Sequence, residues 1–517
     1  MRGIDDVAAA GVGMVWAPEL AAHIDLAVLD LVEIEPQLFW TAAGDATHAV
    51  QANEAAFDAI ASLAKPTLLH SVGLPVANAV AAPARELERL ARDAAHLDPL
   101  WVSEHLSFDT AAIDGKPMWT GFLLPPPQSA AAVRVAAARL RALREIVQRP
   151  VAFETGVNYF KGGDDLLDDG AFFAAVAAAA DCGILLDLHN LWANERNGRA
   201  RLDDVLDALP LERVWELHVA GGHMHRGVYL DAHVGLAHAE LLAIARRVIP
   251  RLPALRAIVF EAVPDSVRAL APGAVAAQIA ALRELWSTRG TRARGTHPTV
   301  TVTADAESHT PDARDLRELS RDEDTLAGAL AGACPADERF ALVGELVREA
   351  RGGTMTRALP LTSRLLMGAL GTGGFLALLN RYASAVPPER YRAADARRFL
   401  DFVATERLDV TYLAEIAAFD RAVLDTIATG EPQLVRFPTD PAPVFTALRE
   451  RARPPALPAD PHAIRVRPNR ISIRRATRWS EKARRIATAA RALVSSGAAA
   501  PRRSTAGASR ENASART

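Results

Sequence analysis

Residues 213–233 read RVWELHVAGGHMHRGVYLDAH, and this stretch decides the fold. It begins with an apolar run of strand length that ends at His218, and the segment behind the run carries Asp231 and His233. Histidine and aspartate are common metal ligands, and side chains two positions apart in an extended segment point the same way. The stretch therefore predicts a β-strand whose carboxyl end faces a metal site.

The same pattern recurs along the first 260 or so residues. Five more apolar runs end on a residue that can hold a metal: PTLLH at His70, LWVSEH at His105, PVAFE at Glu154, GILLD at Asp187 and RAIVFE at Glu261. The runs GVGMVW and LVEIE bring the number of predicted strands to eight. Helical patterns lie between them, which is typical of a parallel sheet covered on both faces. We expect an α/β fold, a (β/α)8 TIM barrel with its functional groups at the carboxyl ends of the strands.

The residues at these strand ends are imidazoles and carboxylates, without a thiolate. Such a set suits iron or manganese better than an iron–sulfur cluster or structural zinc. Taken singly, His105 could cap a helix, Asp187 could be an N-cap, and Glu261 could pair with an arginine. We nevertheless expect a metal site, because independent structural roles would each have to place a ligand-type residue at a strand end. His223 and His225, in the loop after the seventh strand, stay open as further ligands.

The chain divides into four predicted parts. Residues 1–288 form the barrel, and residues 289–311, which are polar and rich in Gly, Pro and Thr, form a linker. Residues 312–455 form a mainly α-helical second domain, with one apolar stripe at helical spacing over 412–427. Residues 456–517 form a basic tail that we expect to be largely disordered.

Composition narrows the class of protein. The formal net charge is only −3 over 517 residues, which argues against a dedicated nucleic-acid binder. The two cysteines, Cys182 and Cys334, exclude a disulfide framework and suit a reducing cytoplasm. No export signal is evident, and the apolar stretch at 365–379 is short for a membrane span and rich in glycine. We therefore expect a cytoplasmic protein without a membrane span.

Six segments resemble the multinuclear non-heme iron-dependent oxidative enzymes, the family that includes the catalytic subunit of methanobactin biosynthesis. They are LLHSVGLP, WVSEHLSF, FETGVNYF, LLDLHNLWANERNG, ELHVAGGH and YLDAH, in the family's order, and the resemblance covers slightly over half the chain. It implies a barrel that holds two or three iron ions and uses dioxygen to remodel cysteine, or sometimes other residues, in ribosomally made precursor peptides. By that resemblance the ligand positions are His70, His105, Glu154, His218, Asp231, His233 and Glu261, with Asp187 and His189 as ligands or partners of ligands.

Four features of the sequence depart from the family's usual pattern. An early Glu-Asn pair is replaced by Gln37 and Leu38, and the asparagine after the fifth strand is replaced by Thr155. The asparagine after LLDL is His189, and the loop AGGH is one glycine longer than usual. These changes bear on the substrate and on the number of metals more than on metal binding itself.

We therefore expect an iron- and dioxygen-dependent oxidase that modifies a precursor peptide, at cysteine, without an organic cofactor. Two other classes stay open. A divalent-metal-dependent barrel isomerase or phosphodiesterase would act without dioxygen, and a non-enzymatic metal-binding protein would bind metal without turnover. The helical region would recognise the leader of the precursor peptide in cis, or serve only dimerisation or stability. The arginine-rich end would bind an acidic leader or a nucleic acid, or form a solvated face.

Overall fold

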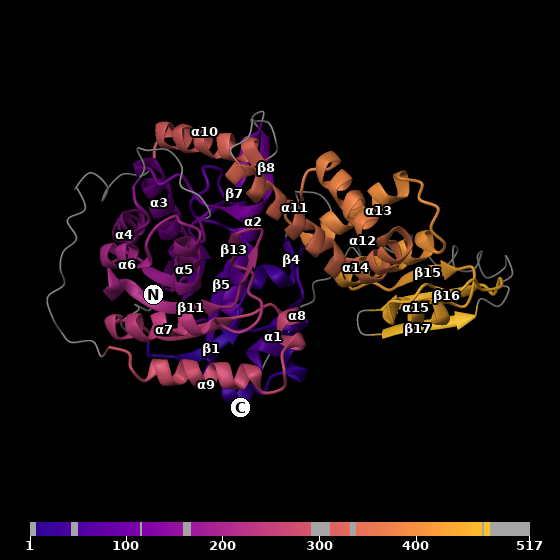
Figure 1. Ribbon diagram of the computed structural model, residues 1–517, viewed down its shortest axis with the longest axis horizontal. Coiled ribbons are helices and arrows are strands. Elements are labelled where there is room, and N and C mark those ends of the chain that lie inside the picture. The colour runs from indigo at the N-terminus through magenta and orange to yellow at the C-terminus, as the bar shows by residue number, and fades with distance from the viewer. Residues whose placement is uncertain are drawn as a thin grey trace, which may run out of the picture.

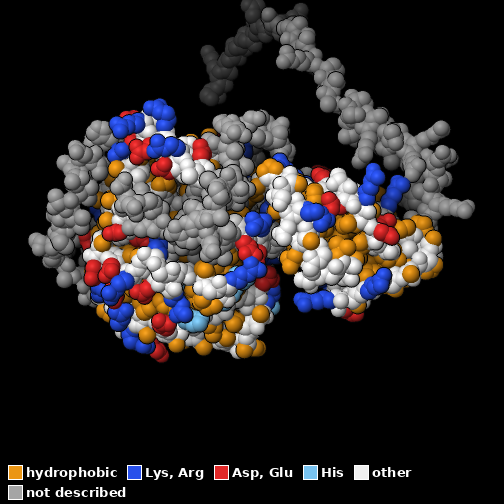
Figure 2. Space-filling view, turned by 45° about the horizontal axis from the view of Figure 1, so that its top comes forward, with side chains coloured by type: hydrophobic (Ala, Val, Ile, Leu, Met, Phe, Trp, Pro, Cys, Tyr) orange, Lys and Arg blue, Asp and Glu red, His pale blue; other side chains and the backbone are white. Residues whose placement is uncertain are grey.

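The computed structural model of the chain describes residues 7–42, 50–113, 116–158, 167–290, 311–330, 338–467 and 470–475. Figure 1 shows two lobes side by side, the larger formed by the first half of the chain and the smaller by the C-terminal part. The space-filling view shows the same two lobes, with apolar and charged side chains mixed over the visible face of each (Figure 2).

The larger lobe is a closed barrel of eight parallel strands, each hydrogen-bonded to the next along the chain and the last to the first. The strands are β1 (Gly11–Val15), β2 (Leu31–Ile34), β5 (Thr67–Ser71), β6 (Val102–His105), β9 (Val151–Glu154), β10 (Gly183–Asp187), β11 (Val214–Ala220) and β14 (Ala257–Glu261). They coincide with the eight apolar runs of the sequence. The (β/α)8 barrel predicted from those runs is therefore confirmed.

Helices cover the outside of the barrel. They are α1 (Glu54–Ala61), α2 (Ala84–Leu97), α3 (Ala130–Val147), α4 (Asp169–Ala180), α5 (Leu188–Arg196), α6 (Leu202–Ala208), α7 (Ala239–Val248), α8 (Pro264–Ala269) and α9 (Ala274–Trp286). The helix α3 shows why they begin where they do, since the Ser129 hydroxyl accepts a hydrogen bond from the Ala132 amide at its N-terminus. The main hydrophobic core lies between these helices and the strands.

The inside of the barrel changes from apolar to ionisable along the strands. At the amino ends of the strands the interior is filled by a core of apolar side chains that includes Leu31, Leu68 and Trp101. Side chains alternate across a strand, so the next inward positions lie two residues further on. Those positions are Glu33 in β2 and His70 in β5, both fully buried. The carboxyl half of the barrel interior is therefore polar.

Three β-hairpins and several short 3-10 helices interrupt the connections between strands and helices. The hairpins are β3 (Trp40–Ala42) with β4 (Val50–Ala52), β7 (Phe108–Ile113) with β8 (Lys116–Leu124), and β12 (His223–His225) with β13 (Val228–Leu230). The 3-10 helices are η2 (Pro18–Ala22), η3 (Leu26–Val28), η4 (Pro36–Phe39), η5 (Leu211–Arg213) and η6 (Ile249–Arg251). Each hairpin follows the carboxyl end of a barrel strand, so all three lie on the side where a barrel carries its site.

The region after residue 311 begins with α10 (Ala313–Leu330), which packs on the barrel, because Leu319 is part of the main core. The remaining elements form the C-terminal lobe, with two hydrophobic cores of its own. They are α11 (Glu338–Ala358), α12 (Pro360–Ala385), α13 (Arg392–Thr405), α14 (Leu413–Thr429), α15 (Pro441–Arg449) and a sheet of β15 (Gln433–Phe437), β16 (His462–Arg467) and β17 (Arg470–Arg475).

The sequence predicts a largely disordered tail over residues 456–517, and within that range the structure describes two strands, β16 and β17, between residues 462 and 475. The segment HAIRVR, at residues 462–467, alternates apolar residues with polar ones, although its arginines make the segment look like part of a basic tail. Ile464 and Val466 are buried in a core of the C-terminal lobe, while Arg465 and Arg467 are exposed. Residues 476–517, and residues 291–310 of the expected linker, lie outside the described part of the chain.

Helix α12 is long and apolar enough to cross a membrane by length and composition alone. It is broken at Gly371, whose φ of 70° and ψ of 166° are not helical. Its side chains Leu366, Phe375 and Tyr382 are buried in a core of the C-terminal lobe. About a third of its most apolar window is buried in the lobe, at 33%.

Candidate metal centre

The first group of ionisable side chains comes from three neighbouring strands, β5, β6 and β9. His105 and Glu154 are directly paired in the parallel ladder, so their side chains meet. Oε2 of Glu154 lies 2.8 Å from Nε2 of His105 and 3.2 Å from Nε2 of His70. The Ser103 hydroxyl lies 2.9 Å from Nδ1 of His70, which leaves Nε2 of that ring facing the group.

A second group lies across the barrel interior and consists of Glu33, His218 and Glu261. Nε2 of His218 lies 3.2 Å from Oε1 of Glu33, and its Nδ1 lies 3.3 Å from Oε1 of Glu261. All three side chains are buried. One imidazole therefore faces a carboxylate on each side.

Asp187 joins the two groups. Its potential ligand atom lies within 4.8 Å of those of Glu154 and His218. Oδ1 of Asp187 accepts a hydrogen bond from the Asn190 amide and so caps α5, while Oδ2 has no hydrogen bond among the described residues. The side-chain amide of Asn190 donates to Oε1 of Glu154 over 3.2 Å. The Asp187 carboxylate can therefore cap α5 through Oδ1 and still offer Oδ2 to a metal ion.

An outer branch leads from Glu261 to the surface. Nε2 of His233 lies 3.3 Å from Oε2 of Glu261 and 3.0 Å from Oδ1 of Asp231. Nδ1 of His189 lies 2.9 Å from the same oxygen of Asp231, and its Nε2 lies 3.2 Å from the Tyr229 hydroxyl. Both ring nitrogens of His189 thus have protein partners. This imidazole is therefore a hydrogen-bonding partner of Asp231.

The two open histidines of the loop after β11 do not join the cluster. His223 is exposed in β12, and Nε2 of His225 lies 3.7 Å from Glu349 of α11. Gly222, one of the two glycines of the AGGH loop, lies against the Tyr229 hydroxyl and the His189 ring, with no room for a side chain.

Gln37 and Thr155, which also differ from the family's usual pattern, have structural roles. The amide of Gln37 donates to the Ser71 hydroxyl over 2.6 Å and its carbonyl accepts from the Val72 amide, which fixes the carboxyl end of β5. The Thr155 hydroxyl accepts a hydrogen bond from the backbone amide of Asp187 over 3.0 Å. Both residues therefore support strand ends that carry members of the cluster.

The expectation from the sequence missed four glutamates that lie in or beside the cluster: Glu33, Glu35, Glu104 and Glu216. The signal was present, because LVEIE and WELH place ionisable residues at every second position of otherwise apolar strands. Glu33 and Glu216 lie two positions before the last residue of their runs, and such positions of a barrel strand also face the interior.

Charge compensation in the first group outweighs the cost of burial. Burial raises the pKa of Glu154, but His105 and His70 overcome that effect and hold the pKa well below its usual range. Burial lowers the pKa of His105, but the carboxylate of Glu154 overcomes it and the pKa lies well above its usual range. The two side chains therefore form an imidazolium–carboxylate pair at neutral pH.

Two carboxyl groups of the cluster resist ionisation. Burial is the main reason that the pKa of Glu33 is raised well above its usual range, and the nearby Glu216 adds to it. Burial likewise raises the pKa of Asp187, with further repulsion from Glu261 and Glu154. Crowding of buried carboxylates is relieved by a bound cation, which replaces protons as the compensating charge.

The cluster fits transition-metal ions. Oδ2 of Asp187 is buried and has no hydrogen bond within the described ranges. Other buried carboxylate oxygens of the cluster, such as Oε2 of Glu154, face imidazole nitrogens. Nitrogen and oxygen atoms lie 2.8–3.3 Å apart. Two ligands that are each about 2.1 Å from one ion are separated by about 3 Å when they bind at right angles. Imidazole with carboxylate is a donor set for iron, manganese or zinc.

A cluster of candidate metal ligands on the carboxyl side of a (β/α)8 barrel defines the class of this protein. The chain belongs to the family of RiPP precursor modification enzymes MbnB/TglH/ChrH, whose model matches residues 11–268. That range covers all eight strands of the barrel and every residue of the cluster. RiPP denotes a ribosomally synthesised and post-translationally modified peptide.

Curated relatives also match part of the chain. A UPF0276 protein of Caulobacter vibrioides is 30% identical over 224 residues, which cover 43% of this chain and 75% of the relative. A UPF0276 protein of Chromobacterium violaceum is 32% identical over 187 residues, which cover 36% of this chain and 66% of that protein. The chain thus spans about two thirds to three quarters of these relatives.

Solved structures resemble the barrel only distantly. A xylose isomerase-like TIM barrel protein from Mycobacterium smegmatis in complex with magnesium is 15% identical, with a TM-score of 0.35, over 56% of this chain and 99% of that protein. D-psicose 3-epimerase from Clostridium cellulolyticum H10 is 10% identical, with a TM-score of 0.33, over 51% of this chain and 90% of the epimerase. Neither likeness bears on the reaction of this chain.

Proposed function

We propose that this protein is an iron- and dioxygen-dependent oxidase that modifies a ribosomally synthesised precursor peptide at cysteine. Membership of the family supports the class of substrate. The observation that carries the proposal is the sharing of Glu154 and His218 between groups of potential ligands, because shared ligands are what a cluster of two or three ions needs. The absence of a thiolate from these groups favours ions that bind nitrogen and oxygen.

Different residues of the cluster would bind each of the two or three ions. His70, His105 and Glu154 would hold one ion, and His218 and Glu261 a second, with Asp187 between them. Asp231 and His233 would hold a third ion near the outer end, with His189 behind Asp231. Glu33 completes the second group, although its position was not expected from the sequence.

Iron in this site would supply open coordination positions for a cysteine thiolate and for dioxygen, and electrons for the oxidation. The protein's own part is to position these groups. Asn190 and Ser103 fix the orientations of Glu154 and His70, and a fixed donor set is what keeps reacting groups aligned. No organic cofactor is needed for this chemistry, and we place the protein in the cytoplasm, where its substrate thiol stays reduced.

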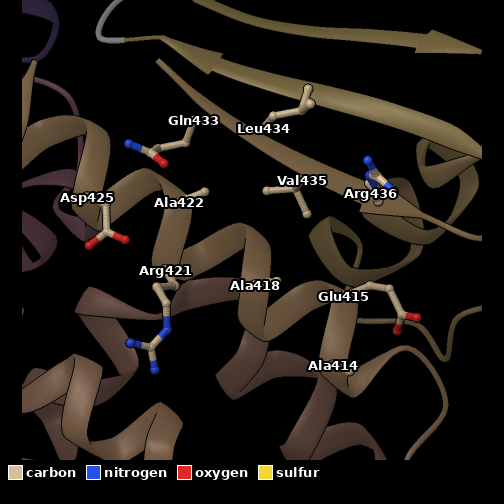
Figure 3. Close-up of a pocket in the computed structure, with 10 residues that line it drawn as sticks. All are labelled: Ala414, Glu415, Ala418, Arg421, Ala422, Asp425, Gln433, Leu434, Val435 and Arg436. Atoms are coloured by element: carbon tan, nitrogen blue, oxygen red, sulfur yellow. The ribbon is translucent and has the colours of Figure 1, made fainter. Parts of the chain in front are cut away.

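The C-terminal lobe is proposed to capture the precursor peptide by its leader. A groove of about 450 Å³ lies along α14 and the first strand of the lobe's sheet (Figure 3). Its lining comes from Ala414, Glu415, Ala418, Arg421, Ala422 and Asp425 on the helix and from Gln433, Leu434, Val435 and Arg436 on the strand. The three alanines recur at intervals of four residues on one face of the helix, and their small side chains leave room for a polypeptide backbone.

The strand side of the groove offers main-chain hydrogen bonds. Among the described strands β15 pairs only with β16, so it is an edge of the sheet. An extended peptide can add to such an edge as a further strand, and the pockets beside it then select side chains. A leader held here raises the local concentration of the attached cysteine at the barrel.

Reaction with a cysteine-containing precursor peptide tests this function. Anaerobically purified protein loaded with ferrous iron should change the mass of the peptide only after dioxygen is admitted, and the change should map to cysteine. Manganese or magnesium should not replace iron. Turnover under nitrogen with a redox-inert metal would instead assign the barrel to isomerase or hydrolase chemistry. Metal binding without any change in the mass of the peptide would indicate a non-enzymatic metal-binding protein.

A further inference from the structure

Arg390 reaches from the C-terminal lobe into the barrel lobe. It lies between α12 and α13, and its side chain is only 20% exposed. Its guanidinium donates hydrogen bonds to the Gly73 carbonyl over 2.8 Å, to Oε2 of Glu86 over 2.9 Å, and to Oδ1 of Asp109 and the Thr110 hydroxyl over 3.0 Å each. One side chain of the lobe thus occupies four acceptors of the barrel.

The first of these acceptors belongs to the loop that follows β5, at residues 72–79. This loop begins two residues after His70 and connects directly to the metal-binding cluster. The Leu74 amide, next to Gly73, donates to Oε2 of Glu104, and Oε1 of Glu104 accepts from the amide of His105. The Val76 amide in turn donates to the His105 carbonyl. A shift of this loop therefore moves the backbone that carries His105.

The two carboxylates that face Arg390 are buried in the barrel lobe. Glu86 and Asp109 are both almost fully buried, and Glu86 also accepts a hydrogen bond from the Tyr391 hydroxyl over 2.8 Å. Asp109 is joined to the loop by Asn78, whose side-chain amide donates to it. Buried carboxylates need a partner cation, and Arg390 is placed between these two.

The far end of the same loop is held by a second residue from beyond position 311. Both carboxylate oxygens of Glu323, on α10, accept from the Ala79 amide, at 2.9 and 3.1 Å. Glu323 is fully buried. The loop is therefore clamped near both ends, at Gly73 and at Ala79, by side chains that lie outside the barrel's own sequence.

We propose that Arg390 is a positioning residue of the metal centre, and that the barrel's site is fully formed only when the C-terminal lobe holds the loop at residues 72–79. Arg390 holds the Gly73 carbonyl and so fixes the loop. The Leu74 amide of this loop donates to the Glu104 carboxylate, which in turn positions the backbone of His105. The lobe thus has a role in the metal centre that is separate from peptide capture. This inference rests on the metal site of the proposed function and not on its oxidative chemistry.

Cobalt(II) binding to the full chain tests the inference without any peptide. Cobalt absorption bands report the ligand geometry, and a titration reports affinity. Arg390→Met should weaken the binding of at least one cobalt ion by about 10-fold or more and change its absorption bands, since partners of metal ligands have effects of about 10- to 100-fold. Arg381→Met is the matched control, because Arg381 pairs with Glu406 inside the lobe at a half-exposed site. It should bind cobalt like the wild type.

Arg390→Lys separates positioning from folding. Its ammonium still lies between Glu86 and Asp109, but a single nitrogen cannot reproduce the four hydrogen bonds of a guanidinium. We expect this variant to fold, with an unchanged circular dichroism spectrum, and to show an intermediate loss of cobalt affinity. Wild-type affinity and absorption bands in folded Arg390→Met, or in Arg390→Lys if the first variant does not fold, would overturn the proposal. Failure of peptide oxidation with cobalt binding intact would count against the oxidase and leave this inference standing.

Discussion

Oε2 of Glu154 lies 2.8 Å from Nε2 of His105, and the two residues are partners in the ladder between β6 and β9. Both are therefore placed by backbone pairing rather than by a flexible loop. The same oxygen lies 3.2 Å from His70, so one carboxylate serves two imidazoles from two other strands. A site built on strand ends in this way is rigid, which is what a metal centre with several ions requires.

Glu154→Gln should reduce the number of metal ions bound per chain. The change removes a shared carboxylate and leaves His105 and His70 without their counter-charge. We expect the loss of about one ion, or affinity weaker by about 100-fold, measured by mass spectrometry of the metal content and by titration. Glu145→Gln, at an exposed position of α3, is the control and should bind like the wild type. Unchanged stoichiometry and affinity in Glu154→Gln would show that this carboxylate is not a ligand.

His189→Asn tests the role of the imidazole behind Asp231. Because both of its ring nitrogens already have protein partners, the substitution should weaken binding of the outermost ion by about 10-fold without removing the ion. His96→Asn, on the outer face of α2, is the control. Complete loss of one ion in His189→Asn would instead identify this histidine as a direct ligand.

Ala418→Trp tests capture of the leader in the groove between α14 and β15. The indole would fill the space beside the strand edge and block an added strand. Binding of a leader-containing peptide should weaken by at least about 10-fold, since the main-chain hydrogen bonds are lost together. The cobalt titration should not change. Ala377→Trp, at an exposed site of α12, is the control. Equal leader affinity in both variants would locate peptide capture elsewhere.

Asp420→Asn tests the pH dependence of the C-terminal lobe. Asp420 on α14 accepts a hydrogen bond from the Thr362 amide at the start of α12, and burial raises the pKa of its carboxyl to about 6. A raised pKa means that the folded lobe binds the proton more tightly, so the contribution of this carboxyl to stability is fully present below about pH 4 and is lost as the pH rises through about 6. Asparagine keeps the acceptor and removes the charge.

Hydrogen exchange of the amides in α12 and α14 measures this effect, with wild type and variant compared at each pH. The two proteins should exchange alike near pH 4, and the variant should be more protected at pH 7.5, by on the order of 2 kcal/mol. Greater protection of the wild type at pH 7.5 would show that the ionised carboxylate stabilises the lobe.

The sequence was sufficient for the barrel, because each strand is an apolar run of the right length that stops at a polar residue. It was also sufficient to bring His70, His105, Glu154, Asp187, His218 and Glu261 to one end of the barrel, since parallel strands end on the same side. Glu33 was missed because it lies inside a strand run, where a charged residue is unusual unless it faces a polar interior.

Other features depend on contacts that no local pattern reveals. Arg390 is separated from Gly73 by 317 positions, and nothing in the sequence around it distinguishes this arginine from its neighbours. The sheet of the C-terminal lobe was missed for a different reason. Exposed arginines alternate with Ile464 and Val466, and their number masked the period of two.

The most direct test of the account is the metal content of anaerobically purified protein, measured by mass spectrometry together with its Mössbauer spectrum. We expect about two or three irons per chain, with spectra of exchange-coupled ferrous or mixed-valence ions, because ions that share carboxylate and imidazole ligands are coupled. Zinc or manganese in place of iron, reproduced after expression with excess iron, would contradict it.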